Sequence, residues 1–266
     1  MATLEWVIDK MNAWAPEATA EDFDNVGLLL GDRSQSVKKI LVALDATDAV
    51  IKEAIDNNYD AIITHHPLTY QPLKKITACD SIGRKLLALA KNGISLYAAH
   101  TNLDKAHGGV NDVLAKILAI ENVTPMAVDK TDPTIGIGRI GGLSREMTLA
   151  ELAEHIKERL ALKEIRYSGD LSTKIKKIAL CGGSGMSFWQ AARDAGCHVY
   201  ITGDVKYSDA LQVLDTGMAI IDITHYSGEN IIVNEIVKVL SGYAIDEGTD
   251  VTFTATGING QIFFNL

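Results

Sequence analysis

Short aliphatic runs alternate with amphipathic stretches along this chain, and no other feature of the sequence restricts its fold as much. Runs at 40–44, 61–64 and 94–99 are rich in Ile, Val, Leu and Ala, and each has the length of a buried strand. The stretches between them carry apolar residues at helical spacing, and Thr148 with Glu151 forms a capping box that predicts a further helix. The sequence therefore predicts an α/β fold with mostly parallel sheets.

The strand-helix-strand pattern occurs twice. Residues 40–63 and 178–201 share the same spacing, at a constant offset of 138 positions. The following strand continues the match at an offset of 125, which aligns two His-x-x-x-acid motifs, at 100–104 and 225–229. Two related α/β domains that face each other across a cleft would produce this repeat. Chance similarity is the alternative, because short aliphatic strands resemble one another.

A break in the periodicity marks the predicted domain boundary. Residues 125–133 contain two prolines and several polar residues, as linkers often do. We therefore expect a first domain formed by residues 1–126 and 244–266, and a second domain formed by residues 127–243. The stretch at 251–264 predicts two strands joined by a glycine-containing turn, which would close the edge of one sheet.

Charge and cysteine content narrow the class of protein. The chain carries 25 Lys and Arg against 34 Asp and Glu, a net charge of −9, without a long block of like charge. This balance argues against a dedicated nucleic-acid or membrane-surface binder. The three cysteines show no Cys-x-x-Cys spacing, so we expect neither a disulfide framework nor a thiolate zinc site. We expect a cytoplasmic protein without a signal peptide or a membrane-spanning segment.

Histidines gather where the predicted strands end. His65, His66, His100 and His225 each follow an aliphatic strand. The carboxyl ends of parallel strands meet at one edge of a sheet, where binding sites are built. A structural role is the more common one for a single histidine in such a place, but four at equivalent strand ends predict a metal site.

The ligand pattern favours two ions over one. Neighbouring side chains on a strand point to opposite faces, and Pro67 keeps His66 extended, so His65 and His66 are suited to different ions. Asp104 and Glu229 supply carboxylates that can bridge two cations. Imidazole and carboxylate ligands without thiolate suit Zn, Mn, Fe, Co or Ni.

A glycine-rich turn offers a second kind of site. Gly183, Ser184 and Gly185 lie between a predicted strand and a helix, where backbone N–H groups can hold a phosphate. A tight turn that needs small residues for packing is an equal alternative, because the turn lacks a lysine and the full dinucleotide motif. Lys206 is a candidate substrate contact, with ordinary surface as its alternative.

Six motifs together resemble those of one family. They are Phe-Asp-Asn-Val-Gly-Leu at 23–28, Ile-Thr-His-His-Pro at 63–67, Ala-His-Thr-Asn-Leu-Asp at 99–104, Gly-Gly-Ser-Gly at 182–185, Ile-Thr-Gly-Asp at 201–204 and His-Tyr-Ser-Gly-Glu at 225–229. In this order they are similar to the motifs of the NGG-interacting-factor-three-like family, whose bacterial members are often named GTP cyclohydrolase I type 2 homologues. The resemblance implies a dinuclear metal site with the ligands His65, His66, Asp104, His225 and Glu229.

The resemblance also implies an architecture: two related α/β domains, two divalent metal ions in the cleft between them, and a toroidal homohexamer. The chain departs from the family's pattern in two places. The link between 118 and 135 is too short for the middle domain of larger members. Tyr207 and Ser208 stand where many relatives carry a histidine, so no histidine ligand is expected from that loop.

The resemblance and the ligand types predict a dinuclear metal-dependent hydrolase of a nucleotide or related phosphorylated heterocycle, with GTP ring opening as the named candidate. His100, four residues before Asp104, is expected to orient a ligand or to move a proton. One alternative is a metal-binding homo-oligomeric scaffold, regulatory partner or metal-handling protein without turnover. Another is a phosphate- or nucleic-acid-related hydrolase that uses the same metals.

Overall fold

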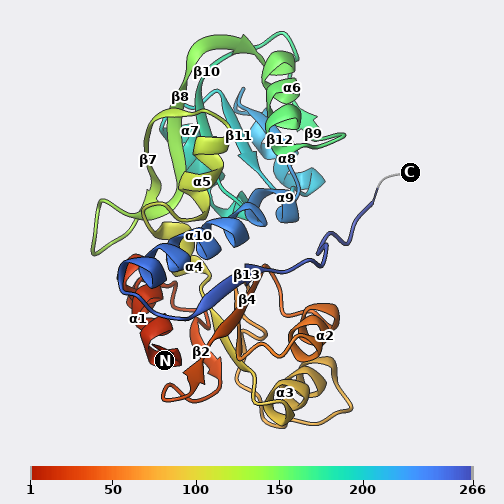
Figure 1. Ribbon diagram of the computed structural model, residues 1–266. Coiled ribbons are helices and arrows are strands. Elements are labelled where there is room, and N and C mark those ends of the chain that lie inside the picture. The colour runs from red at the N-terminus through yellow and green to blue at the C-terminus, as the bar shows by residue number, and fades with distance from the viewer. Residues whose placement is uncertain (1, 265–266) are drawn as a thin grey trace. The chain divides into compact units, whose positions relative to one another are not determined.

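The structure is a computed structural model that describes residues 2–264 (Figure 1). Its chain divides into two compact units. The first contains the residues up to Leu103 and those from Ile232 onward, and the second is Asp104–Ile231. None of the helices in the described part of the chain is long and apolar enough to cross a membrane.

The first unit is built on a five-stranded sheet with strand order β13-β4-β5-β6-β2. Its elements are β1 (Ala2–Thr3), α1 (Leu4–Trp14), η1 (Glu17–Thr19), β2 (Gly27–Leu30), β3 (Ser36–Val37), β4 (Lys39–Ala43), α2 (Asp48–Asp56), β5 (Ala61–Thr64), α3 (Ser81–Lys91), β6 (Ser95–Ala98), α10 (Ile231–Asp246) and β13 (Thr252–Ala255). Four of the strands run parallel, and β2 is antiparallel to β6 at one edge. β1 and β3 form a separate antiparallel pair.

Helices α2 and α3 lie side by side on one side of this sheet, and α1 lies on the other side (Figure 1). Leu41 and Ile62 of the sheet share one buried cluster with Ala54 of α2 and Leu89 of α3. This burial of apolar side chains is the main force that holds the layers together. The N-cap Thr47 accepts the N–H of Val50 at 3.1 Å, which helps α2 begin directly after β4.

The second unit is built on a six-stranded sheet with strand order β7-β8-β10-β11-β12-β9. Its elements are β7 (Glu121–Val128), β8 (Gly136–Thr148), α5 (Val110–Ile117), α6 (Leu149–Leu160), β9 (Arg166–Ser168), β10 (Lys174–Leu180), η2 (Gly185–Phe188), α7 (Trp189–Asp194), β11 (Val199–Thr202), α8 (Tyr207–Leu214), β12 (Ala219–Asp222) and α9 (His225–Glu229), and the five-residue α4 (Thr101–Lys105) spans the boundary between the units. The three central strands β10, β11 and β12 are parallel, whereas β7, β8 and β9 make antiparallel pairs.

Helices cover both faces of this sheet. Successive residues of a strand point to opposite faces, so neighbouring residues belong to different buried clusters. Ile178 and Ile221 belong to a buried cluster with residues of α5 and α6. Their neighbours Ala179 and Ile220 belong to a second cluster with residues of α7 and α8. Helix α6 begins with the predicted capping box, in which Thr148 and Glu151 bind each other's backbone N–H groups. The predicted α/β class is confirmed, with parallel strands at the centre of each sheet.

The register of the two sheets follows the sequence repeat for two strands and differs by one residue at the third. Ile40 pairs with Ala61, and the residues 138 positions further on pair in the same way. Ser95 and Ala219 then occupy corresponding positions, an offset of 124 and not 125. His225 is therefore the first residue of α9, whereas His100 directly precedes α4.

The boundaries of the units differ from the predicted domains at residues 104–126 and 232–243. Leu114 of α5 packs in the core of the second unit, which draws this segment away from the first. The supposed linker also contains a strand, since Pro125 lies in β7 opposite Arg139. β7 is an edge strand, where the missing N–H of a proline is tolerated.

The end of the chain forms one strand where two were predicted. β13 closes the edge of the five-stranded sheet beside β4, as expected. After Ala255 no strand follows within the residues up to 264. Glu53 of α2 accepts hydrogen bonds from Thr256 and from the N–H of Gly257, the latter at 3.0 Å. These contacts tie the chain to α2 where a hairpin turn was expected.

Candidate metal-binding site

Three histidines cluster at the carboxyl end of the first unit's sheet. His65 and His66 follow β5, and His100 follows β6. Because these strands are parallel neighbours, with Thr64 opposite Ala98, their ends lie side by side. The ring centroids are 5.1 Å apart for His65–His66 and His65–His100, and 5.5 Å apart for His66–His100. Each histidine offers one nitrogen, and these nitrogens all lie within 4.8 Å of one another.

The two neighbouring histidines converge, although strand alternation predicts opposite directions. β5 ends at Thr64 and the chain bends at the next two residues, so the alternation of a strand no longer applies. The hydroxyl of Thr64 donates to the carbonyl of His66 at 2.8 Å and supports this bend. His65 and His66 can therefore serve the same cluster.

Hydrogen bonds determine which nitrogen of each ring is available as a ligand. His65 is fully buried, and its Nδ1 lies 2.8 Å from the carbonyl oxygen of Ala99. A carbonyl only accepts, so Nδ1 carries the proton and the lone pair of the neutral ring is on Nε2. His66 Nδ1 lies 2.8 Å from Oδ1 of Asp45, which favours the same tautomer. Metal-binding histidines are held in this way.

The third histidine, His100, is held by the buried carboxylate of Asp24. Nδ1 of His100 lies 3.0 Å from both oxygens of Asp24. The side chain of Asp24 is fully buried and also accepts the N–H and the hydroxyl of Thr101, at 3.0 and 2.5 Å. Burial raises the pKa of Asp24, but the hydrogen bonds from His100 and Thr101 outweigh it and hold the pKa well below its usual range. Asp24 is therefore a carboxylate at neutral pH.

The second unit presents a histidine and a carboxylate one helical turn apart. Nε2 of His225 lies 2.8 Å from Oε2 of Glu229, and its Nδ1 lies 2.7 Å from Oδ2 of Asp204. Thr224, the N-cap of this short helix, has a φ of 67°, which is strained for a β-branched residue. Its N–H donates to the buried carboxylate of Asp222, two residues earlier, at 2.8 Å, and this local hydrogen bond supports the strained residue that precedes His225.

The glycine-rich turn provides the space in which Glu229 lies. A Cβ at Gly183 would come within 1.9 Å of Oε1 of Glu229. The N–H groups of Gly182 and Gly185 donate to the side chains of Asn111 and Thr202, at 2.9 and 3.0 Å. Close packing thus accounts for the small residues of this turn, while phosphate binding by Gly183, Ser184 and Gly185 stays a prediction.

The charges of Asp104 and Glu229 both affect the pKa of the buried Cys181 thiol. Burial raises the pKa of Cys181 above its usual range, and the negative charges of Asp104 and Glu229 raise it further. Asn111 connects the same parts of the unit, because it donates to the carbonyl of Asp104 at 3.1 Å and accepts from Gly182. The second unit therefore gathers two carboxylates and one histidine around the glycine-rich turn.

Several partners of the histidines were not singled out from the sequence. Asp24 and Asp45, which hold His100 and His66, are not among the site residues that the sequence predicts. Asp45 lies two residues after β4, so the rule that sites form at the carboxyl ends of parallel strands could have found it. Lys206 is the exposed N-cap of α8 and lines a pocket with Arg166 and Tyr207.

Known proteins are similar to this chain in sequence and in fold. The family model described as Duf34/NIF3 (NGG1p interacting factor 3) matches residues 2–259. A protein of Clostridium perfringens named GTP cyclohydrolase 1 type 2 homolog is 43% identical over 223 residues, 84% of this chain and 85% of that protein. A protein of the same name from Streptococcus pneumoniae is 34% identical over 264 residues, 98% of each chain.

A solved structure agrees with the sequence matches. The crystal structure of a Bacillus cereus protein related to NIF3 superposes with a TM-score of 0.94 at 26% identity, covering 100% of this chain and 99% of that one. The family model and both relatives cover most of the chain. The chain therefore belongs to the Duf34/NIF3 (NGG1p interacting factor 3) family.

Proposed function

We propose that this protein is a metal-dependent hydrolase that acts on a nucleotide or a related phosphorylated heterocycle. The observation that carries the proposal is the cluster of His65, His66 and His100, each with its Nδ1 hydrogen-bonded to an oxygen. This arrangement holds three imidazoles in the orientation that metal ligation needs. In addition, the names of the relatives point to a cyclohydrolase.

In this proposal two divalent cations are held by His65, His66, Asp104, His225 and Glu229. The donors fit such ions, because they combine neutral imidazole nitrogens with carboxylates that offset positive charge. Bound divalent cations would supply Lewis acidity, which lowers the pKa of a water and offsets charge on an oxyanion. Zn, Mn, Fe, Co and Ni all suit these ligands.

The remaining side chains orient the ligands, and one of them is placed to transfer a proton. Asp45 and Asp204 lie 2.8 and 2.7 Å from the Nδ1 atoms of His66 and His225, and these contacts fix the orientation of the two rings. His100 is held by the carboxylate of Asp24, both oxygens of which lie 3.0 Å from Nδ1, so the orientation of its ring is fixed. In the proposed reaction His100 either adds a ligand or transfers a proton at Nε2.

The test is metal loading followed by turnover. Protein purified without chelator is analysed for bound elements, then incubated with GTP, other nucleotides and phosphodiesters. We expect about two divalent ions per chain and formate release from GTP. Asp104→Asn and His65→Ala should weaken metal binding by at least about tenfold and abolish turnover. His107→Ala is the matched control, because this exposed histidine lies near Asp104 in sequence but outside the three-histidine cluster.

Each other outcome points to a different function. Two bound ions without turnover of any substrate would favour the scaffold, regulatory or metal-handling alternative. Turnover of phosphodiesters and not of GTP would favour a hydrolase of another phosphate substrate. Light scattering on the same sample measures the proposed homohexamer, and fractionation of the source cells tests the proposed cytoplasmic location.

A further inference from the structure

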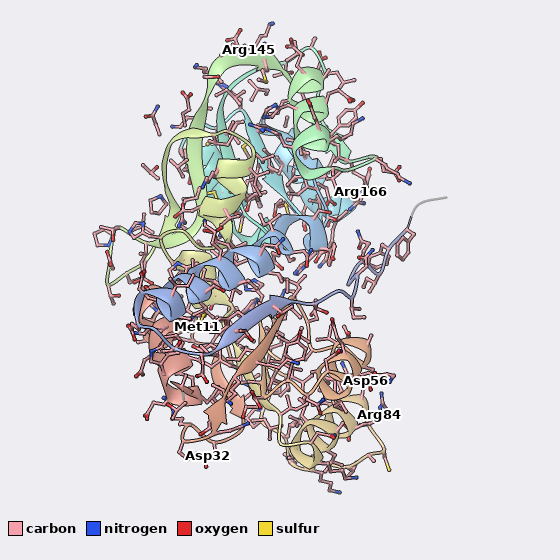
Figure 2. All side chains as sticks on the ribbon, in the orientation of Figure 1. Met11, Asp32, Asp56, Arg84, Arg145 and Arg166 are labelled. Atoms are coloured by element: carbon pink, nitrogen blue, oxygen red, sulfur yellow. The ribbon has the colours of Figure 1, made fainter. Side chains whose placement is uncertain are left out.

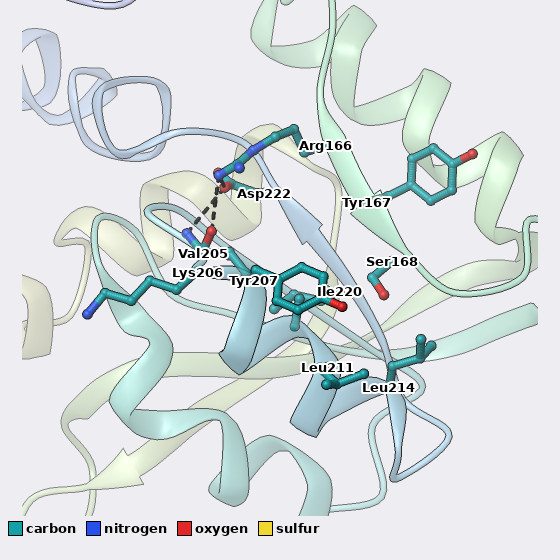
Figure 3. Close-up of a pocket in the computed structure, with 11 residues that line it drawn as sticks. Arg166, Tyr167, Ser168, Val205, Lys206, Tyr207, Leu211, Leu214, Ile220 and Asp222 are labelled. Atoms are coloured by element: carbon teal, nitrogen blue, oxygen red, sulfur yellow. Dashed lines mark hydrogen bonds and ion pairs between the residues drawn. The ribbon is translucent and has the colours of Figure 1, made fainter.

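The second unit carries a pocket that the proposed function does not use. Its volume is about 420 Å³, which lies in the range of small-molecule sites. β9, β12 and α8 supply its walls (Figure 3). In the view of Figure 3, Arg166 with Asp222 lies at one end, Leu211 with Leu214 at the other, and the ring of Tyr207 between them.

The polar end of the pocket is built around an arginine whose position is set by the sheet. Arg166 and Asp222 are direct cross-strand neighbours of β9 and β12. Asp222 is 4% exposed, and it accepts from Nη2 of Arg166 and from the N–H of Val205, the latter at 3.2 Å. Nη2 also donates to the carbonyl of Val205 at 3.2 Å. A buried carboxylate and a carbonyl therefore hold one corner of an otherwise exposed guanidinium.

The other donors of this guanidinium are available to a ligand. In the described part of the chain, the side-chain hydrogen bonds of Arg166 all come from Nη2. Nε and Nη1 keep N–H groups that make no hydrogen bond there, and Nη1 can donate a charge-assisted hydrogen bond to an anionic group. Lys206 adds a second positive charge to the lining, against the single carboxylate of Asp222. The pocket thus carries a net positive charge.

The apolar side chains at the other end of the pocket are exposed to solvent. The exposed fractions are 84% for Tyr207, 47% for Leu211 and 43% for Leu214. Ile220 lies behind the tyrosine ring in the lining of the same pocket. An aromatic ring stacks well on tyrosine and leaves water when it contacts leucine side chains.

From these observations we propose that this pocket binds a small molecule with an aromatic or similarly planar apolar ring that carries one anionic group. The anionic group accepts a hydrogen bond from Nη1 of Arg166. The ring lies on Tyr207 and extends toward Leu211 and Leu214. The charge of the pocket and the separation of its polar and apolar ends favour this class of ligand over neutral apolar or purely ionic molecules.

Two naphthalene dyes test the proposal on the full chain. Anilinonaphthalene sulfonate carries a ring system and one anion, and N-phenyl-1-naphthylamine is its neutral analogue. Fluorescence titration should give one saturable sulfonate site per chain. Arg166→Gln should weaken sulfonate binding about tenfold, the size of one hydrogen bond to a charged group, and leave the binding of the neutral dye unchanged. Leu211→Ser should weaken the binding of both dyes.

The matched controls lie outside the pocket. Arg145→Gln removes another exposed arginine of the same unit, which lies away from Arg166 in Figure 2. Replacing Phe263 and Phe264 with serine removes exposed aromatic rings that could attract the dyes. Neither control should alter saturable sulfonate binding. Thermal unfolding of each variant identifies misfolded protein, and Lys206→Gln, at an exposed site, replaces Arg166→Gln if that variant does not fold.

Three results would overturn the proposal. One is that both dyes bind equally well to the unaltered chain. Another is that the pocket variants bind the sulfonate as tightly as the controls do. The third is that binding disappears when Phe263 and Phe264 are replaced. Because the assay needs no metal and no turnover, its outcome does not depend on the proposed hydrolase activity.

Discussion

Asp24 binds His100 through both carboxylate oxygens, each 3.0 Å from Nδ1 of the ring. The two residues are far apart in sequence, and the first precedes β2 while the second follows β6. β2 and β6 are antiparallel neighbours, so the start of one lies beside the end of the other. The sheet thus brings an anion to the histidine that stands beside His65 and His66.

Asp24→Asn should make the orientation of the His100 ring less fixed and weaken metal binding. An amide can still accept from Thr101, but its nitrogen cannot accept, so it cannot bind Nδ1 of His100 through both terminal atoms. Loss of such an outer partner lowers metal affinity by about 10- to 100-fold. Competition against a chelating dye measures this change. Asp32→Asn is the control, because Asp32 is exposed, its carboxylate accepts from the N–H and the hydroxyl of Ser34, and it is labelled in Figure 2. Equal affinities in the two variants would contradict the prediction.

Gly183→Ala should displace Glu229. The new Cβ would lie 1.9 Å from Oε1 of Glu229, and the φ of 63° adds backbone strain. We expect a loss of about 2 to 4 kcal/mol in the free energy of unfolding, measured with urea, together with weaker metal binding. Gly196→Ala has a φ of 71° with nothing within 4 Å of the new Cβ, so it reports the backbone strain alone. A similar loss in both variants would show that Glu229 does not fill the space at Gly183.

The three cysteines should differ in reactivity. Cys79 is exposed, whereas Cys181 and Cys197 are buried. Burial raises the pKa of the Cys197 thiol to about 11 and that of Cys181 above its usual range, so neither forms a thiolate at pH 8. A disulfide reagent should modify one thiol rapidly in the folded protein and three after denaturation. Cys79→Ser should remove the rapid phase; a rapid phase that persists in this variant would contradict the buried positions of the other two.

Asp129 should contribute to stability at neutral pH and lose this contribution in acid. Hydrogen bonds from Thr131 and the ion pair with Lys105, 3.0 Å away, hold its pKa well below its usual range. The folded protein therefore binds this proton less readily than the unfolded chain. The stabilisation is complete above the unfolded-state pKa of about 4 and is lost as the pH falls from there through the folded-state value.

Replacing Asp129 tests this sign. Asp129→Asn should lower the melting temperature at pH 7 and narrow the gap between the melting temperatures at pH 7 and pH 3. Differential scanning calorimetry at the two pH values measures both effects. Asp56→Asn is the control, since Asp56 makes only an exposed ion pair with Lys52 and exposed pairs contribute little. An unchanged gap in Asp129→Asn would contradict the prediction.

Much of the fold was readable from local patterns. Strands β5 and β11 and the capping box at Thr148 lie where the sequence predicts them, because buried strands and helix starts depend on residues close in sequence. The clustering of three histidines could be predicted for a related reason. His65, His66 and His100 stand at strand ends, and parallel strands bring their ends to one edge.

Tertiary structure decided what depends on residues distant in sequence. The pairing of β2 with β6 places Asp24 against His100, and the packing of Leu114 assigns its helix to the second unit. The bend after Thr64 turns His65 and His66 toward the same cluster, and the empty space beside Gly183 is filled by Glu229. Local propensity and periodicity carry no information about such partners, because a hydrogen bond or a packed side chain depends on which segments the whole chain brings together.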